Sequence, residues 1–169
     1  MPIKLKIQGQ SISVDERFAN VSNFLKEAWQ PDLDEELILS ETQVTLRAFE
    51  ALKSYYEFNS FEPQIIDAIS NDPNTCFLNE FNRELIMKYN VFEGNELQEL
   101  IQAAIYLQTV AFKKLCLARI AIEFYINKQE PNKSFNELKN RFNLKNTALT
   151  LGDVERFKQV YPTIVNKYN

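Results

Sequence analysis

The spacing of apolar residues changes after Val14, and this change restricts the chain to folds that combine a small sheet with helices. In the runs 3–7 and 11–14, apolar and polar residues alternate, and Gln8–Gly9–Gln10 separates the two runs. Alternation with a period of two predicts a β-hairpin with one buried face. From Phe18 onward the apolar residues recur every three to four positions, which predicts helices.

The segment up to residue 63 adds two helical regions and one more strand. The apolar spacing over 18–29 predicts an amphipathic helix or two short helical turns. Residues 37–39 predict a short third strand. Ser40 and Thr42 are candidates for the start of a helix whose apolar positions run from residue 45 until Phe61–Glu62–Pro63 ends it.

Residues 64–93 carry weaker signals. Ile65, Ile66 and Ile69 are spaced as in one helical turn. The polar run 71–74, which contains Pro73, predicts a loop, and 79–86 predicts a link into a short helix.

The remainder of the chain predicts helices. Asn95 is the expected N-cap of a helix whose apolar positions run over 97–105. A second helix, 109–127, is apolar on more than one face, so we expect it to be central and buried. Residues 127–133 form a linker, after which Ser134 and Glu137 have the spacing of a capping box. The predicted fold is therefore α+β and mainly helical, ending in a short helix from residue 150.

Composition argues against common catalytic chemistry. The 169 residues include no His, three Gly and two Cys. Without an imidazole base there is no Ser-His-Asp or Cys-His site, and two Cys cannot form the usual zinc cage. Three Gly supply no glycine-rich phosphate loop. The acidic run 31–36 lacks the spacing of a calcium loop, so we expect a solvated loop, and we expect Cys116 to be a buried thiol. We predict no enzyme and no cofactor.

Charge and hydropathy restrict the classes of partner that we expect the chain to bind. The net charge is −4 and the pI is near 5.0, which disfavours binding to a phosphate backbone. No window has the roughly 20 apolar residues of a membrane span, and the N-terminus lacks a signal-peptide pattern. We therefore expect a soluble intracellular protein that binds neither nucleic acid nor membrane.

Four stretches in the same order resemble the S-phase kinase-associated adaptor family, the linker subunits of cullin-based SCF ubiquitin ligases. Residues 3–15 are similar to the opening hairpin of the family. Residues 97–107 resemble its LxELIxAANYL helix, 138–146 resemble its IRKTFNIKND segment, and 150–160 resemble its acidic final helix.

The resemblance implies a BTB/POZ-like domain at 1–126 and a C-terminal helical extension at 127–169. It implies a non-catalytic adaptor that clasps an F-box helical motif with its last helices and bridges it to a cullin. Tyr106 and Ile105 fall on the family's cullin-facing helix. The positions expected to bind the F-box are Phe112, Leu115, Ile120, Leu138, Phe142, Leu144, Val154 and Phe157.

Departures from the family pattern keep a second hypothesis open. Ile105 stands where the family has Asn, and Gln108–Thr109–Val110 replaces its Asp-Ile-Lys. A diverged adaptor could keep the F-box partner, lose the cullin and serve as a structural subunit of a large assembly. The first hypothesis predicts a cytoplasmic and nuclear protein, and the second an assembly such as the cytoskeleton or a cilium. Both predict a heteromeric complex rather than a homo-oligomer.

Overall fold

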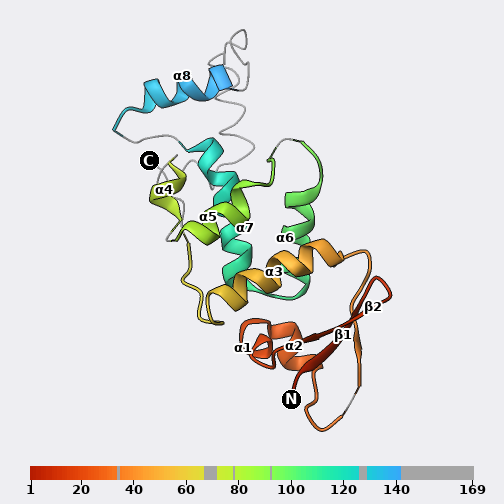
Figure 1. Cartoon of the computed structure of the whole chain (residues 1–169). Coiled ribbons are helices and arrows are strands. Elements are labelled where there is room, and N and C mark those ends of the chain that lie inside the picture. The colour runs from red at the N-terminus through yellow and green to blue at the C-terminus, as the bar shows by residue number, and fades with distance from the viewer. Residues whose placement is uncertain (34, 67–71, 78, 92, 126–128, 142–169) are drawn as a thin grey trace, which may run out of the picture. The chain divides into compact units, whose positions relative to one another are not determined.

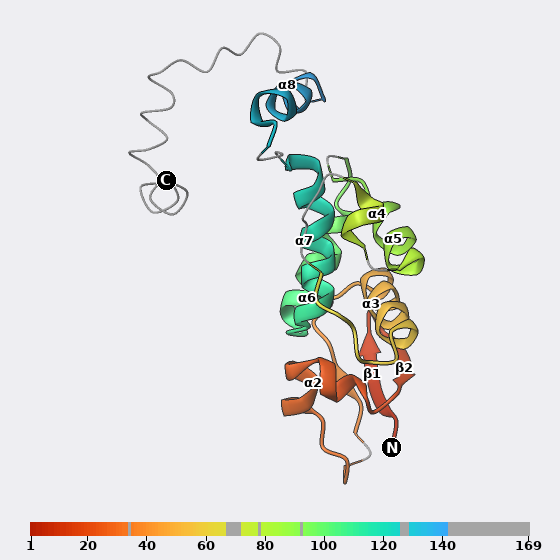
Figure 2. The ribbon, with the colours of Figure 1, turned by 90° about the vertical axis from the view of Figure 1, so that its left-hand side faces the viewer.

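The computed structural model describes residues 1–141 except positions 34, 67–71, 78, 92 and 126–128. The chain divides into two compact units, Met1–Ile126 and Asn127–Asn169. The described residues form a mixed α+β fold that is mainly helical and contains one three-stranded sheet (Figure 1), as the sequence predicts. In the first unit, α3 lies between the strands and the later helices α5, α6 and α7 (Figures 1 and 2).

The predicted hairpin is confirmed. Strands β1 (Ile3–Ile7) and β2 (Gln10–Val14) pair antiparallel with Ile3 opposite Val14. All three apolar side chains of β1 are fully buried on one face. Gln8 and Gly9 have φ values of 48° and 78°, and positive φ at both central residues is typical of the two-residue turn that follows the twist of the strands.

The third strand of the sheet lies more than twenty residues after the hairpin in the sequence. Strand β3 (Leu37–Ile38) pairs in parallel with β1, so the order is β2-β1-β3. A parallel pair needs a crossover connection, and here it includes α1 (Phe18–Val21) and α2 (Asn23–Ala28). The sequence predicts either one helix or two short helical turns over 18–29, and the structure has two short helices. Ser22 separates them, because its extended backbone ends α1 and its Oγ accepts the Leu25 N–H to cap α2.

Helix α3 (Leu46–Phe58) supplies the centre of the core. Its N-cap is Thr45, whose Oγ1 accepts the Ala48 N–H at 3.2 Å. The predicted start at Ser40 or Thr42 was therefore wrong, because both lie in the preceding turn with their hydroxyl oxygens 3.1 Å apart. The core around α3 is aromatic. The ring of Phe18 lies 5.0 to 6.1 Å, between centroids, from the rings of Phe49, Tyr56 and Phe61.

Two short helices follow. Helix α4 (Pro73–Cys76) has Asp72 as N-cap and Pro73 in its first turn, where the missing N–H of proline has no helical partner to lose. The loop predicted at 71–74 is thus wrong from Pro73 on. The predicted short helix is confirmed as α5 (Glu80–Met87) with Asn79 as its N-cap. Ile65 and Ile66 are not helical, and Ile69 lies outside the described residues.

Helices α6 (Glu96–Tyr106) and α7 (Val110–Phe124) pack against each other, and α7 also contacts α5. Asn95 precedes α6 as predicted, although its side chain makes no capping hydrogen bond. A tight connection joins the two helices: Gln108 has a φ of 54°, and the Thr109 N–H donates to the Ala104 carbonyl at 2.9 Å.

The second unit contributes one described helix, α8 (Pro131–Arg141). Because α8 begins at Pro131, Ser134 lies inside the helix, so the predicted capping box at Ser134 and the linker through residue 133 were wrong. The helix predicted from residue 150 lies outside the described residues.

Candidate protein-binding surfaces

The end of α6 is held in place by a hydrogen bond from a distant part of the chain. Ser22 Oγ donates to the Leu107 carbonyl at 2.6 Å while accepting the Leu25 N–H at 3.1 Å. Ser22 is buried, so both bonds are shielded from water. One hydroxyl therefore caps α2 and also satisfies a carbonyl that the end of α6 leaves without a helical partner.

The other end of α6 is tied to α3 by charge. Arg47 pairs with Glu96 and, at 2.9 Å, with Glu99, and Thr45 Oγ1 donates to Glu99 at 3.1 Å. The hydrogen bond from Arg47 is the main reason that the pKa of Glu99 lies below its usual value. These contacts fix the first turn of α6 against α3, so α6 is held at both of its ends.

The last turn of α6 presents the two residues expected to face a cullin, and we call Ile105 with Tyr106 the α6 corner. Tyr106 is half-buried, and its ring packs on Phe24 with 4.9 Å between centroids. Its hydroxyl accepts the Ser40 N–H at 3.5 Å, which places the end of β3 beside α6. The Ile105 side chain is 58% exposed. The α6 corner is thus one anchored aromatic beside one exposed aliphatic side chain.

The residues expected to clasp an F-box occupy different environments. Phe112 and Leu115 have no exposed surface. Phe112 lies 5.4 Å from the Tyr55 ring, so in this conformation both residues form the core of the first unit. Ile120 is half-buried, as is Leu138 on α8. Four further positions lie outside the described residues: Phe142, Leu144, Val154 and Phe157.

One of the apolar faces of α7 is exposed. Leu117 and Phe124 are 45% and 48% exposed, and Ala121 is exposed between them. Together with half-buried Ile120 they follow the spacing i, i+3, i+4 and i+7, so they lie on one side of the helix. We call these four residues the α7 stripe. The sequence predicts a central and buried α7; the structure buries one side of the helix, including Phe112, Leu115 and Cys116, and leaves this side exposed. The signal was present as this spacing, but the opposite face of α7 is equally apolar.

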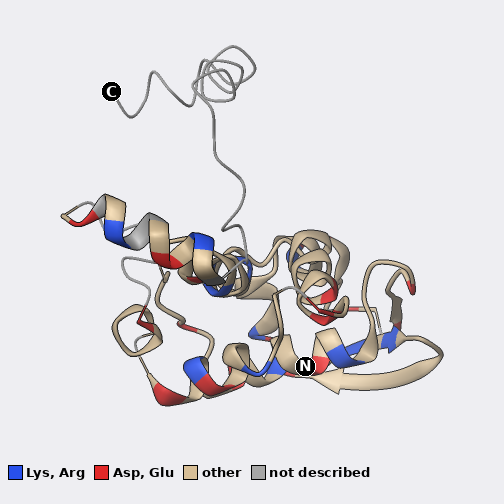
Figure 3. Cartoon of the chain, turned by 90° about the horizontal axis from the view of Figure 1, so that it is seen from above, with Lys and Arg blue, Asp and Glu red and all other residues tan. Residues whose placement is uncertain are grey.

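Three further observations concern thiol reactivity, metal binding and membrane spanning. Cys116 is fully buried as expected, and burial raises the pKa of its thiol to about 12. Within residues 1–141, outside the gaps, there is no group of three acidic, Cys or His side chains that could hold a metal ion. Acidic and basic residues are mixed along the ribbon (Figure 3). No helix among the described residues is long and apolar enough to cross a membrane.

Comparison with known proteins adds no family to these surfaces. No protein-family model matches the chain, and no curated protein matches it. The α6 corner and the α7 stripe therefore rest on the residues and contacts described above.

Proposed function

We propose that this chain is a non-catalytic adaptor that resembles the S-phase kinase-associated family. Its first unit is a BTB/POZ-like domain, and it joins an F-box-containing protein to a cullin in an SCF-type ubiquitin ligase. The order of elements supports the proposal: a hairpin, a helical crossover, a parallel third strand, α3, and then the α6–α7 pair. The stretch 3–15 covers β1 and β2, the stretch 97–107 covers most of α6, and residues 138–141 of the third stretch lie on α8. The rest of the third stretch and the fourth stretch lie outside the described residues.

The α7 stripe is the observation that carries the proposal. A helix face with Leu117 and Phe124 about half exposed suits a partner that lays its own apolar helix alongside. Full burial of a Leu or Phe side chain contributes about 1.5–3 kcal/mol. Because about half of the Leu117 side chain and of the Phe124 side chain is already buried, covering the exposed half of each contributes roughly 1 kcal/mol. The pair therefore supplies roughly 2 kcal/mol, or about a thirtyfold change in affinity.

The α6 corner is the proposed cullin contact. Tyr106 is fixed by its packing on Phe24 and by its hydroxyl, so a partner meets a preformed aromatic surface. Ile105 favours the second candidate function, in which the chain is a structural subunit without a cullin. Its exposed aliphatic side chain stands where the family has Asn, so a contact built for an amide would meet a methyl-bearing surface instead.

The experiment compares four forms of the tagged full chain by affinity purification and mass spectrometry. The forms are the wild type, the α7-stripe variant Leu117→Gln/Phe124→Gln, the corner variant Ile105→Lys, and the control Ile65→Gln. Gln preserves helix propensity, and Lys is compatible with the C-terminal end of a helix. Ile65 is 56% exposed and belongs to neither surface, so it reports the general effect of removing an exposed apolar side chain.

We expect the wild type and the control to retain an F-box-containing protein and a cullin. The α7-stripe variant should lose the F-box protein, and the corner variant should lose only the cullin. Recovery of an F-box protein and a large assembly without any cullin would replace the adaptor by the structural subunit. If the wild type retains neither class of partner, or if the α7-stripe variant retains all of them, the proposal is wrong.

A further inference from the structure

Strand β3 has one edge that no described strand covers. In the order β2-β1-β3, β1 lies on one side of β3, and the sheet ends on the other. The Leu39 N–H donates to the Lys6 carbonyl at 3.0 Å, so residues 37 and 39 direct their backbone groups toward β1. Successive residues of a strand direct their backbone groups to opposite edges. The N–H and C=O of Ile38, which lies between residues 37 and 39, therefore face outward. The Ile38 side chain is 74% exposed.

The free edge is short and has a defined end. The next outward-facing residue after Ile38 is Ser40, whose N–H already donates to the Tyr106 hydroxyl. The free edge therefore extends from Ile38 back toward Glu36. A segment that pairs there can form only two or three main-chain hydrogen bonds, so side-chain contacts must supply the rest of its affinity.

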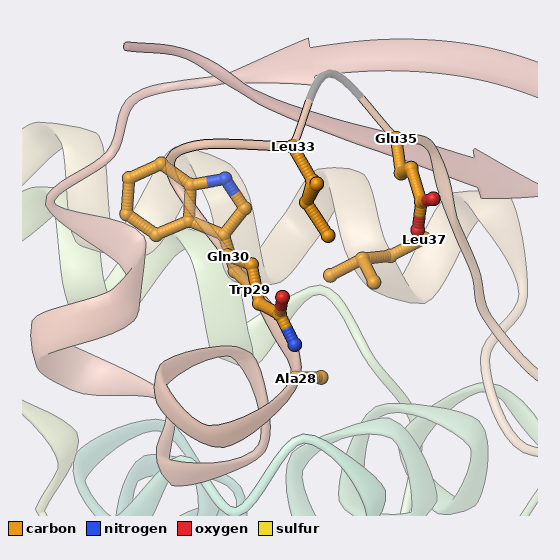
Figure 4. A pocket seen from close by; sticks show the side chains of 6 residues that line it. All are labelled: Ala28, Trp29, Gln30, Leu33, Glu35 and Leu37. Atoms are coloured by element: carbon orange, nitrogen blue, oxygen red, sulfur yellow. The ribbon is translucent and has the colours of Figure 1, made fainter.

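A small hollow lies beside this edge. It is lined by Trp29, Leu33 and Leu37 with Ala28, Gln30 and Glu35 (Figure 4). Leu33 and Leu37 point toward each other across it, and Glu35 lies next to Leu37. Its volume of about 50 Å³ is far below the roughly 300 Å³ of a typical small-molecule site. It has room for the tip of one apolar side chain, and a residue paired alongside Leu37 would be positioned to place one there.

The chain segment that contains β3 carries charge of one sign, and the basic side chain of Lys6 belongs to β1, where it is the register partner of Ile38. Between Gln30 and Thr42 the sequence contains Asp32, Asp34, Glu35, Glu36 and Glu41 and no Lys or Arg. Glu35 and Glu36, which lead directly into β3, are exposed. A second copy of the chain would bring an identical acidic segment to the same place, so like-charge repulsion disfavours it. A basic segment would be attracted.

We propose that the outer edge of β3 binds an extended segment of a partner protein, with adjacent apolar residues flanked by Lys or Arg. The segment pairs with the Ile38 N–H and C=O. One apolar side chain enters the hollow beside Trp29, and its neighbour covers Ile38. The flanking basic side chains lie near Glu35 and Glu36. This site is separate from the α7 stripe and does not depend on the adaptor proposal.

The test measures fluorescence anisotropy of a labelled peptide, Lys-Arg-Val-Leu-Val-Arg-Lys, with the full chain. Ile38→Pro removes the outward N–H but leaves the inward bonds of residues 37 and 39, and proline is tolerated at a sheet edge. Ile38→Val is its control, because it keeps the N–H and an apolar side chain. Glu35→Gln/Glu36→Gln removes the local charge, and Glu50→Gln/Glu84→Gln removes the same charge from exposed positions on α3 and α5.

We expect saturable binding that weakens at least fivefold in Ile38→Pro and is unchanged in Ile38→Val. Binding should also weaken at least fivefold in Glu35→Gln/Glu36→Gln and at high salt, while the Glu50/Glu84 control binds like the wild type. Circular dichroism confirms that each variant is folded. No saturation at millimolar peptide would overturn the proposal. So would equal binding by folded Ile38→Pro, or equal binding of a peptide with Glu in place of Lys and Arg.

Discussion

Replacing Ser22 by Ala tests whether one hydroxyl connects α2 to the end of α6. The substitution removes the N-cap of α2, which costs about 1 kcal/mol. It also leaves the buried Leu107 carbonyl without the donor that lies 2.6 Å away, which costs about 1–3 kcal/mol. We therefore expect the free energy of unfolding to fall by about 3 kcal/mol. At about 2–4 °C per kcal/mol, Tm should fall by about 6–12 °C.

The measurement is urea denaturation followed by circular dichroism and by the fluorescence of Trp29, the only Trp in the chain. The m-value should stay unchanged while the midpoint falls. Ser13→Ala, on the exposed face of β2, is the control and should stay within about 0.5 kcal/mol. Ser22→Gly separates the two terms, because Gly replaces Ser at an N-cap at a cost of only a few tenths of a kcal/mol. If Ser22→Ala costs less than about 0.5 kcal/mol, the proposed connection makes no net contribution and the reasoning is refuted.

Three further outcomes follow from buried or charged groups. Burial raises the pKa of the Cys116 thiol to about 12. Iodoacetamide at pH 8 should therefore alkylate Cys116 at least about a thousandfold more slowly in the folded chain than in urea. Mass spectrometry measures the two rates, and comparable rates would contradict the burial of this thiol. Hydrogen bonds from Arg17 lower the pKa of Asp15 to about 2, so its stabilising contribution is present above the unfolded pKa and is lost as the pH falls through about 2. The substitution Arg17→Ala should return the pKa of Asp15 toward 3.8, as measured by NMR titration. An unchanged pKa would rule out the ion pair with Arg17 as the cause of the shift. Leu5→Ala, at a fully buried position of β1, should cost about 2–5 kcal/mol in urea denaturation, and a cost below about 1 kcal/mol would show that the core relaxes around the cavity.

The elements that could be predicted are those defined by local spacing. The hairpin follows from alternation over 3–14, and α6 and α7 follow from long helical patterns. The errors lie where several local signals compete. Ser40, Thr42 and Thr45 can each cap a helix, and in the structure Thr45 caps α3. Likewise, Ser134 has the spacing of a capping box, yet Pro131 already occupies the first position of α8.

The candidate surfaces were harder to predict, for a different reason. Periodicity shows that α7 is apolar on several sides, but it does not reveal which side the rest of the chain covers. As a result Phe112 and Leu115, expected at an interface, lie in the core, whereas Leu117 and Phe124 face outward. The bond between Ser22 and Leu107 joins residues far apart in the sequence and leaves no local pattern.

The position of β1 in the middle of the sheet has a consequence for folding during synthesis. One edge of β1 is covered by β2 almost at once, but the other waits for β3, and residues 8–36 must be translated in between. At about 5–20 residues per second, this edge stays open for roughly one and a half to six seconds. During that interval the nascent chain presents an unpaired strand edge, the kind of surface that other chains can pair with. Lys4 and Lys6, on the face opposite the buried apolar residues, place positive charge along β1 while it waits.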